Sequence, residues 1–146
     1  MSIISSTIVS NGYAGIRNES NPVVIHNSII ANHTTNCAGG GWLQSLGHNI
    51  IGSGCELVVI QPSDQVNIDP LVTTYPVGIG RLYALRPGSP AIDSGDPASC
   101  EIADERGVAR PQGAACDIGA YEYVTPGTAN IIGVAYGPDQ IVGVGR

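Results

Sequence analysis

A short apolar segment recurs at a fixed spacing in the first third of this 146-residue chain. The three copies, aligned on their isoleucines, are residues 7–11 (TIVSN), 28–32 (SIIAN) and 49–53 (NIIGS). Ile8, Ile29 and Ile50 are therefore 21 residues apart. A constant period of about 20 residues with one short strand per repeat is typical of a solenoid, in which each repeat pairs with its neighbours. We expect these three isoleucines to lie directly above one another.

Each repeat contains more than one strand candidate. Residues 15–17 and 23–26 are short segments built around Ile and Val, and polar turns separate them. The 20 Gly and 10 Pro disfavour helices, the clustered Val, Ile and Thr favour strands, and the absence of Phe makes the core aliphatic. We therefore predict an all-β fold, a right-handed parallel β-helix (a solenoid) of about 21 residues per coil over residues 1–84.

Two polar features within these coils lead to local predictions. Asn11 and Asn32 share one offset, which predicts either an amide ladder at a turn or two ordinary turn asparagines. Residues 36–41 (NCAGGG) are rich in glycine, which tolerates positive φ angles, and we expect a loop there.

Residues 85–124 differ from the coils because they are strongly charged. They carry seven of the chain's 12 carboxylates and three of its six basic residues, all of them arginines. A segment with so few apolar residues must be held against something already folded. Arg–carboxylate forks fix irregular chain well, so we expect structural ion pairs among Asp93, Asp104, Asp117, Arg106 and Arg110. We interpret this segment as an irregular, disulfide-bonded C-terminal cap.

The four cysteines allow three pairings, of which the sequence-local one is simplest. It joins Cys37 to Cys55 and Cys100 to Cys116. Zinc is the rival interpretation, but no Cys-x-x-Cys is present and the histidines do not lie at ligand spacing from the cysteines. Two disulfides predict an oxidising location, at the cell surface or outside the cell.

The charge balance excludes two classes of partner. The net charge is −6 and the chain contains no Lys, so no basic cluster is available to neutralise nucleic-acid phosphates or anionic lipid. No run of about 18 apolar residues is present, so we expect no membrane insertion.

Several motifs occur in a characteristic order in the second half of the chain. They are residues 45–51 (SLGHNII), 67–71 (NIDPL), 85–93 (LRPGSPAID) and, with gaps, 106–122 (RG, RP and CDIGAYE). Together they resemble the C-terminal end of bacterial right-handed parallel β-helix surface proteins of the choice-of-anchor Q type, over roughly residues 5–123. The resemblance implies a secreted or surface-displayed β-helix with a C-terminal cap.

The carboxylates are better explained by structure than by catalysis. Glycoside-cleaving β-helices need acids on adjacent coils facing one groove, whereas residues 1–56 contain only Glu19 and Glu56 as acids. We therefore expect no catalytic residues and no enzyme. Asp93, Asp96 and Asp104 are hard oxygen donors and weak calcium candidates, but their spacing matches no calcium loop; otherwise we expect no metal and no cofactor.

The ends of the chain suggest assembly. Residues 2–5 (SIIS) resemble a strand and not a cap, so Ile3 and Ile4 would present an open edge. Residues 125–146 form a glycine-rich apolar tail in which a spare strand, with Ile131, Ile132 and Val134, would complete such an edge.

We accordingly predict a non-catalytic, extracellular structural or adhesive module of a bacterial surface protein. It would form a homo-oligomer or filament by stacking end to end, since non-closing contacts propagate. The alternative is a carbohydrate-binding or polysaccharide-cleaving β-helix with a surface glycan as its partner. Trp42 and Tyr13 are the candidate stacking platforms in the coils.

Overall fold

The computed structural model describes residues 1–55, 58–73 and 82–126. The strands are β1 (Ser2–Ile4), β2 (Thr7–Val9), β3 (Ala14–Arg17), β4 (Val23–His26), β5 (Ile29–Ala31), β6 (Thr35–Ala38), β7 (Leu43–Ser45), β8 (Ile50–Ile51), β9 (Val58–Val59) and β10 (Gln65–Val66). In the described ranges, helix is confined to one 3-10 turn, Pro97–Ser99. The predicted all-β character is confirmed.

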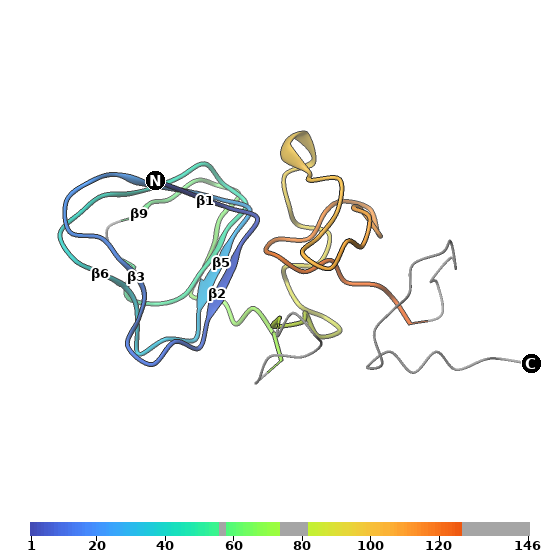
Figure 1. The fold of residues 1–146 in the computed structure, drawn as a ribbon, viewed down its shortest axis with the longest axis horizontal. Coiled ribbons are helices and arrows are strands. Elements are labelled where there is room, and N and C mark those ends of the chain that lie inside the picture. Colours follow the sequence, from blue (N-terminus) through green and yellow to red (C-terminus); the bar gives the residue numbers. More distant parts are fainter. Residues whose placement is uncertain (56–57, 74–81, 127–146) are drawn as a thin grey trace, which may run out of the picture.

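The strands form three sheets in which the named strands pair in parallel. Sheet A has the order β1-β4-β7-β9, sheet B the order β10-β8-β5-β2, and sheet C contains β3 and β6. The chain visits the sheets in rotation, and Figure 1 shows the result as superposed three-sided loops. We number these loops as turn 1 (β1 to β3), turn 2 (β4 to β6), turn 3 (β7 and β8) and turn 4 (β9 and β10). Mostly parallel pairing is thus confirmed.

The predicted register of sheet B is correct between turns 2 and 3 and wrong between turns 1 and 2. Ile29 pairs with Ile50 as expected, but Ile8 pairs with Ile30 and not with Ile29. The reason is that turn 1 is one residue longer: the Ser6 N–H donates to Ser28 Oγ across 22 positions, whereas the equivalent bond from turn 2 spans 21. Since alternate residues face opposite sides of a strand, a one-residue slip exchanges the two faces of a strand.

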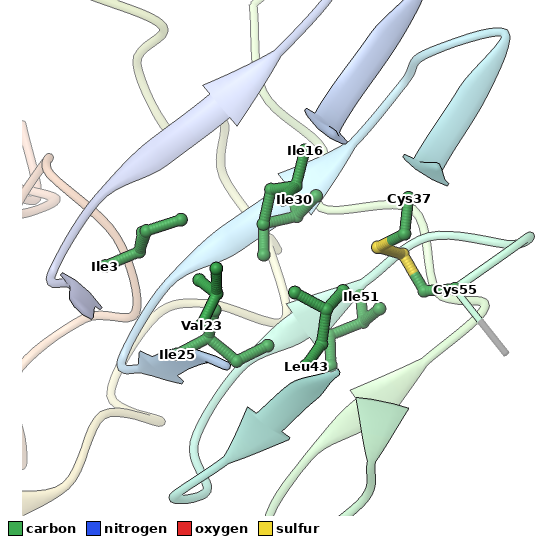
Figure 2. Packing of buried hydrophobic residues seen from close by; sticks show 9 residues of the cluster. All are labelled: Ile3, Ile16, Val23, Ile25, Ile30, Cys37, Leu43, Ile51 and Cys55. Carbon is green, nitrogen blue, oxygen red and sulfur yellow. A yellow bond between two sulfur atoms is a disulfide. The ribbon is translucent and has the colours of Figure 1, made fainter. Parts of the chain in front are cut away.

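The inward faces of the three sheets enclose an aliphatic core. Its buried members, seen in Figure 2, are Ile3, Ile16, Val23, Ile25, Ile30, Cys37, Leu43, Ile51 and Cys55. They stack in columns because the strands pair in register: Ile3 pairs with Ile25, and Ile30 pairs with Ile51. Equivalent aliphatic side chains therefore stack in the interior, but Ile29 and Ile50 of the predicted column lie in a second cluster on the outer face of sheet B.

Turn 3 is shorter than the turns before it. Leu43 pairs with Val58, and the Asn49 N–H donates to Asp64 Oδ1 across only 15 positions. Among the described residues, the stack is therefore two strands deep at sheet C and four strands deep at sheets A and B. At sheet C, the Cys37–Cys55 disulfide joins β6 to the loop after β8.

Residues 82–123, which we call the lateral segment, pack against the outer face of sheet B. The buried apolar residues of this second cluster are Val9, Ile29, Ala31, Ile50, Val72, Leu85, Ala91 and Ile118. Hydrogen bonds reach all four turns: from Ala120 N to Thr7 Oγ1, Gly119 N to Asn27 O, Gln65 Nε2 to Pro90 O, and between His48 Nδ1 and Ser94 O. Figure 1 shows this yellow-to-orange segment beside β2 and β5. The predicted cap therefore covers the flank of the coils.

Candidate functional site

Both predicted disulfides are formed. Cys37 is bonded to Cys55 and Cys100 to Cys116, and no described cysteine is free. The second bond closes a loop within the lateral segment, and this loop contains Asp104, Arg106 and Arg110 of the predicted ion pairs.

Asp104 and Arg106 form one of these ion pairs. Arg106 donates through Nε and Nη2 to Asp104 Oδ2, at 2.9 and 2.7 Å. The buried carboxylate also accepts the backbone N–H groups of Arg106, Val108 and Glu122. The Arg106 guanidinium lies 3.5 Å from the ring centroid of Tyr121, a cation–π arrangement. This pair fixes the loop to the end of the lateral segment.

Arg110 pairs with Glu122, a residue that the sequence analysis did not select. Arg110 Nε lies 3.6 Å from Glu122 Oε2, and the side chains are 3% and 0% exposed. The guanidinium also donates to the carbonyls of Asp117 and Gly119, and Glu122 accepts the N–H groups of Gln112 and Asp117. The signal in the sequence is a single carboxylate between Tyr121 and Tyr123, where a surface acid is not expected.

Asp93 and Asp117 were predicted to form ion pairs, but in the structure their carboxylates hold backbone amides. Asp93 Oδ1 accepts from Ala115 N, and Asp117 accepts from Asp93 N and Tyr123 N. Burial raises the pKa of Asp117 to about 6; the two N–H donors oppose this, and the nearby Glu122 and Asp93 charges add to it.

The pKa of Asp117 predicts that stability falls as pH rises from about 4 to about 6. The folded chain keeps this proton up to pH about 6, while the unfolded chain loses it near 3.8, so the contribution is complete below 3.8 and lost above 6. A shift of this size corresponds to about 2–3 kcal/mol. Urea unfolding at pH 4 and pH 7 measures it. Asp117→Asn removes this slope, and Glu101→Gln, at an exposed carboxylate, retains it.

The calcium candidates do not converge. Asp96 accepts from Ala98 N and Ser99 Oγ and faces His26, while Asp93 and Asp104 hold the separate partners given above. Within residues 1–55, 58–73 and 82–126, no three His, Cys, Asp or Glu side chains are grouped so as to hold a metal ion. The three aspartates thus stabilise loops individually.

A column of polar side chains that was not predicted from the sequence lies at the corner between sheets A and B. The N–H of Ser6 donates to Ser28 Oγ, that of Ser28 to Asn49 Oδ1, and that of Asn49 to Asp64 Oδ1. Each polar side chain therefore accepts a backbone N–H from the preceding turn. The predicted Asn11–Asn32 ladder is not formed, because the longer first turn places Asn11 beside His33, whose Nδ1 accepts the Asn11 N–H.

The candidate carbohydrate platforms lie apart. Tyr13 precedes β3 in turn 1 and Trp42 precedes β7 in turn 3, with 68% and 74% of each residue exposed. A shallow polar hollow of about 320 Å³ lies elsewhere and includes Asn32, His33 and Asp69 in its lining. His33 is not a free base there, since both ring nitrogens contact turn 1, Nδ1 at Asn11 and Nε2 at the Ile8 carbonyl.

The predicted assembly edge is partly described. β1, β2 and β3 each pair with one strand, so turn 1 presents an open edge in all three sheets of the described structure. Ile3 points inward and is buried, whereas Ile4 points outward and is 48% exposed. Ile131, Ile132 and Val134, which were predicted to complete this edge, lie outside the described residues.

Residues 36–38, which were expected in a loop, instead belong to β6.

In comparisons with family models, with curated proteins and with solved structures, nothing matches this chain. In the part of the chain that the structure describes, no helix is long and apolar enough to cross a membrane.

Proposed function

We propose that this chain is a non-catalytic, extracellular structural module of a bacterial surface protein, built as a right-handed parallel β-helix that stacks end to end with further copies. The stacked parallel turns and their in-register aliphatic columns support this architecture. The two disulfides support an oxidising location outside the cytoplasm. The resemblance of residues 5–123 to choice-of-anchor Q proteins points the same way.

The carboxylates of the lateral segment support a structural role. Glu122 and Asp104 are bound by guanidinium groups and backbone amides, and Asp117 is bound by backbone amides alone. A general acid or nucleophile must be able to reach a substrate. These groups are buried and directed at their own chain, which favours a role in fixing the segment on sheet B.

The observation that carries the proposal is the open edge of turn 1. Val24 N donates to Met1 O, and Ser5 N donates to His26 O. By the alternation of a parallel ladder, the N–H of Ile4 then points away from β4, where no strand of the described residues lies. An open parallel edge is a template for a further strand.

The opposite end of the stack offers a complementary surface. Val66 pairs with Ile51 in the inward column of sheet B, yet Val66 is 37% exposed and Ile51 is fully buried. Ile60, which follows β9 in sheet A, is 45% exposed. Stacking turn 1 of a second copy here would bury both residues under Ile3 and Ile8. Because turn 3 is short, such stacking would run through sheets A and B.

We expect Ile4→Pro to abolish end-to-end stacking. Proline removes the outward N–H of Ile4 without removing a bond to β4, so the edge can no longer accept a strand. The mass of the chain in native buffer, measured by light scattering over a concentration series, should fall from oligomer to monomer.

Ile4→Ala is the matched control, since it removes the same apolar side chain and keeps the N–H; it should still assemble. Circular dichroism on both variants shows whether they remain folded. A wild-type chain that stays monomeric at every concentration would rule out the assembly part of the proposal. The same measurement without residues 126–146 tests the predicted contribution of the tail.

A further inference from the structure

The corner between sheets A and B carries a second set of contacts that is separate from the ion pairs of the lateral segment. Here residues 94–99 of that segment dock on turns 2 and 3. His26 Nε2 lies 3.3 Å from Asp96 Oδ2, and His48 Nδ1 lies 2.9 Å from the carbonyl of Ser94. Asn27, which follows His26 in turn 2, makes two hydrogen bonds to the same segment. Its Oδ1 accepts the Asp96 N–H, and its Nδ2 donates to Ser99 Oγ.

The sequence positions two of these side chains by the same backbone device. Asn27 and His48 both adopt positive φ angles, 48° and 55°, as does Ser5 in turn 1. Asn27 and His48 directly precede the column members Ser28 and Asn49, and Ser5 precedes Ser6, whose N–H binds Ser28. Turns 1 to 3 therefore change from sheet A to sheet B at equivalent places. The corner side chains are therefore held by the coils, and residues 94–99 bind to a fixed surface.

The contacts at this corner are polar, and three of the groups are titratable. The His26 and Asp96 side chains are 12% and 25% exposed. The Ala98 N–H lowers the pKa of Asp96, with the Ser99 hydroxyl and the His48 and His26 charges contributing in the same direction against burial. Asp64 is the charged group of the neighbouring turn, where its carboxylate accepts the N–H of Asn49, next to His48.

We propose that His26, His48 and Asp96 form a pH-dependent clasp that holds residues 94–99 on the coils more firmly in mildly acidic than in alkaline solution. Imidazole gains its proton over the physiological pH range. His48 Nδ1 already faces a carbonyl, which can only accept, so protonation leaves this hydrogen bond intact. His26 Nε2 lies 3.3 Å from Asp96 Oδ2, where a protonated ring forms an ion pair. Protonation adds positive charge beside a carboxylate, which strengthens the contact.

The Asp96 carboxylate sets the lowest pH at which the clasp holds. The pKa of Asp96 is lowered from its ordinary value, chiefly by the Ala98 N–H, so its carboxylate stays ionised in mildly acidic solution. The stability that Asp96 contributes is present above pH 3.8 and is lost only as the pH falls through its lowered pKa. The clasp is therefore tightest in mildly acidic solution and weakens on both sides. Opening is local, because the Cys100–Cys116 disulfide keeps residues 94–99 tethered.

Amide hydrogen exchange tests the clasp at one reporter, the Asp96 N–H that donates to Asn27 Oδ1. After correction for intrinsic exchange, we expect its protection factor at pH 5.5 to exceed that at pH 8 by about fivefold, the contribution of a partly exposed ion pair. Asp96→Asn keeps an oxygen for the Ala98 N–H but removes the charge, and should show no such difference. His26→Gln with His48→Gln should show none either.

Two controls separate the clasp from changes in global stability. The measurements are made in the Asp117→Asn background, which removes the pH dependence of global stability described above. In that background the Gly52 N–H, which donates to the Ile30 carbonyl in the coils, should not change between pH 5.5 and pH 8. His33→Gln, at a histidine whose hydrogen bonds to the described residues are made to turns 1 and 2, should leave the pH dependence unchanged. A wild-type reporter without pH dependence, or an undiminished dependence in Asp96→Asn or in the double glutamine variant, overturns the proposal. This test does not depend on end-to-end assembly.

Discussion

Arg110→Met is expected to lower the free energy of unfolding by about 3–5 kcal/mol. Methionine preserves much of the aliphatic stem but removes the guanidinium, which leaves the Glu122 carboxylate buried without its cation. It also removes the donors to the carbonyls of Asp117 and Gly119. An uncompensated buried charge is costly because the protein interior cannot replace its hydration. Urea unfolding monitored by circular dichroism at pH 7 measures the change.

Arg17→Met is the matched control. Arg17 pairs with Glu19 at 2.6 Å, closer than Arg110 is to Glu122, but both side chains are mostly exposed, 61% and 59%. Exposed pairs contribute little, so this variant should change stability by less than about 0.5 kcal/mol. If the two arginine variants were equally destabilised, burial of the Arg110 pair would not be the cause. Adding Glu122→Leu to Arg110→Met should recover part of the loss, because the unpaired charge is then gone.

The repeat of isoleucines was sufficient to predict parallel all-β structure, and composition added the aliphatic core. The one-residue error in the first step arose because both Ile29 and Ile30 are isoleucines. Either of them aligns with Ile8, so the apolar pattern does not fix the register. The register is fixed instead by Ser28, whose hydroxyl accepts the Ser6 N–H.

The position of the lateral segment could not be predicted for a related reason. Strands β5 and β8 of sheet B are buried on both faces, so they appear as continuous apolar runs without alternation. Such a run shows that something covers the outer face but does not identify it. The covering residues, such as Ala91 and Ile118, are isolated apolar positions within a charged segment and show no periodicity.

Ion-pair prediction succeeded where the partners are close in sequence and failed where they are not. Asp104 and Arg106 are two residues apart, and one loop suffices to bring them together. Arg110 and Glu122 meet only after residues 111–121 have folded back, which no local spacing reveals. Strand β6 was missed because its sequence, TNCA, has no apolar run; it forms because β3 pairs with it and Cys37 faces the core.

The polar column could not be predicted by comparing positions of a single residue type. A search for identical residues at equal offsets selects Asn11 and Asn32, but the column that forms is Ser28, Asn49 and Asp64. These three side chains differ, yet each presents one oxygen to the N–H of the turn before. What repeats is the hydrogen-bond acceptor at a fixed corner, and chemically different residues supply it.

Asn49→Ala is expected to destabilise the fold by about 2–4 kcal/mol, because it removes the central member of this column. Asn49 is fully buried; its Oδ1 accepts the Ser28 N–H, and its Nδ2 donates to Ser45 Oγ, the Gly47 carbonyl and Asp64 Oδ1. Alanine leaves the Ser28 N–H without its acceptor in the interior and removes one hydrogen bond each from Ser45, Gly47 and Asp64. Asn11→Ala, at an exposed asparagine, should change stability by less than about 0.5 kcal/mol in the same urea titration. Equal effects at the two positions would mean that the column does not hold the turns together.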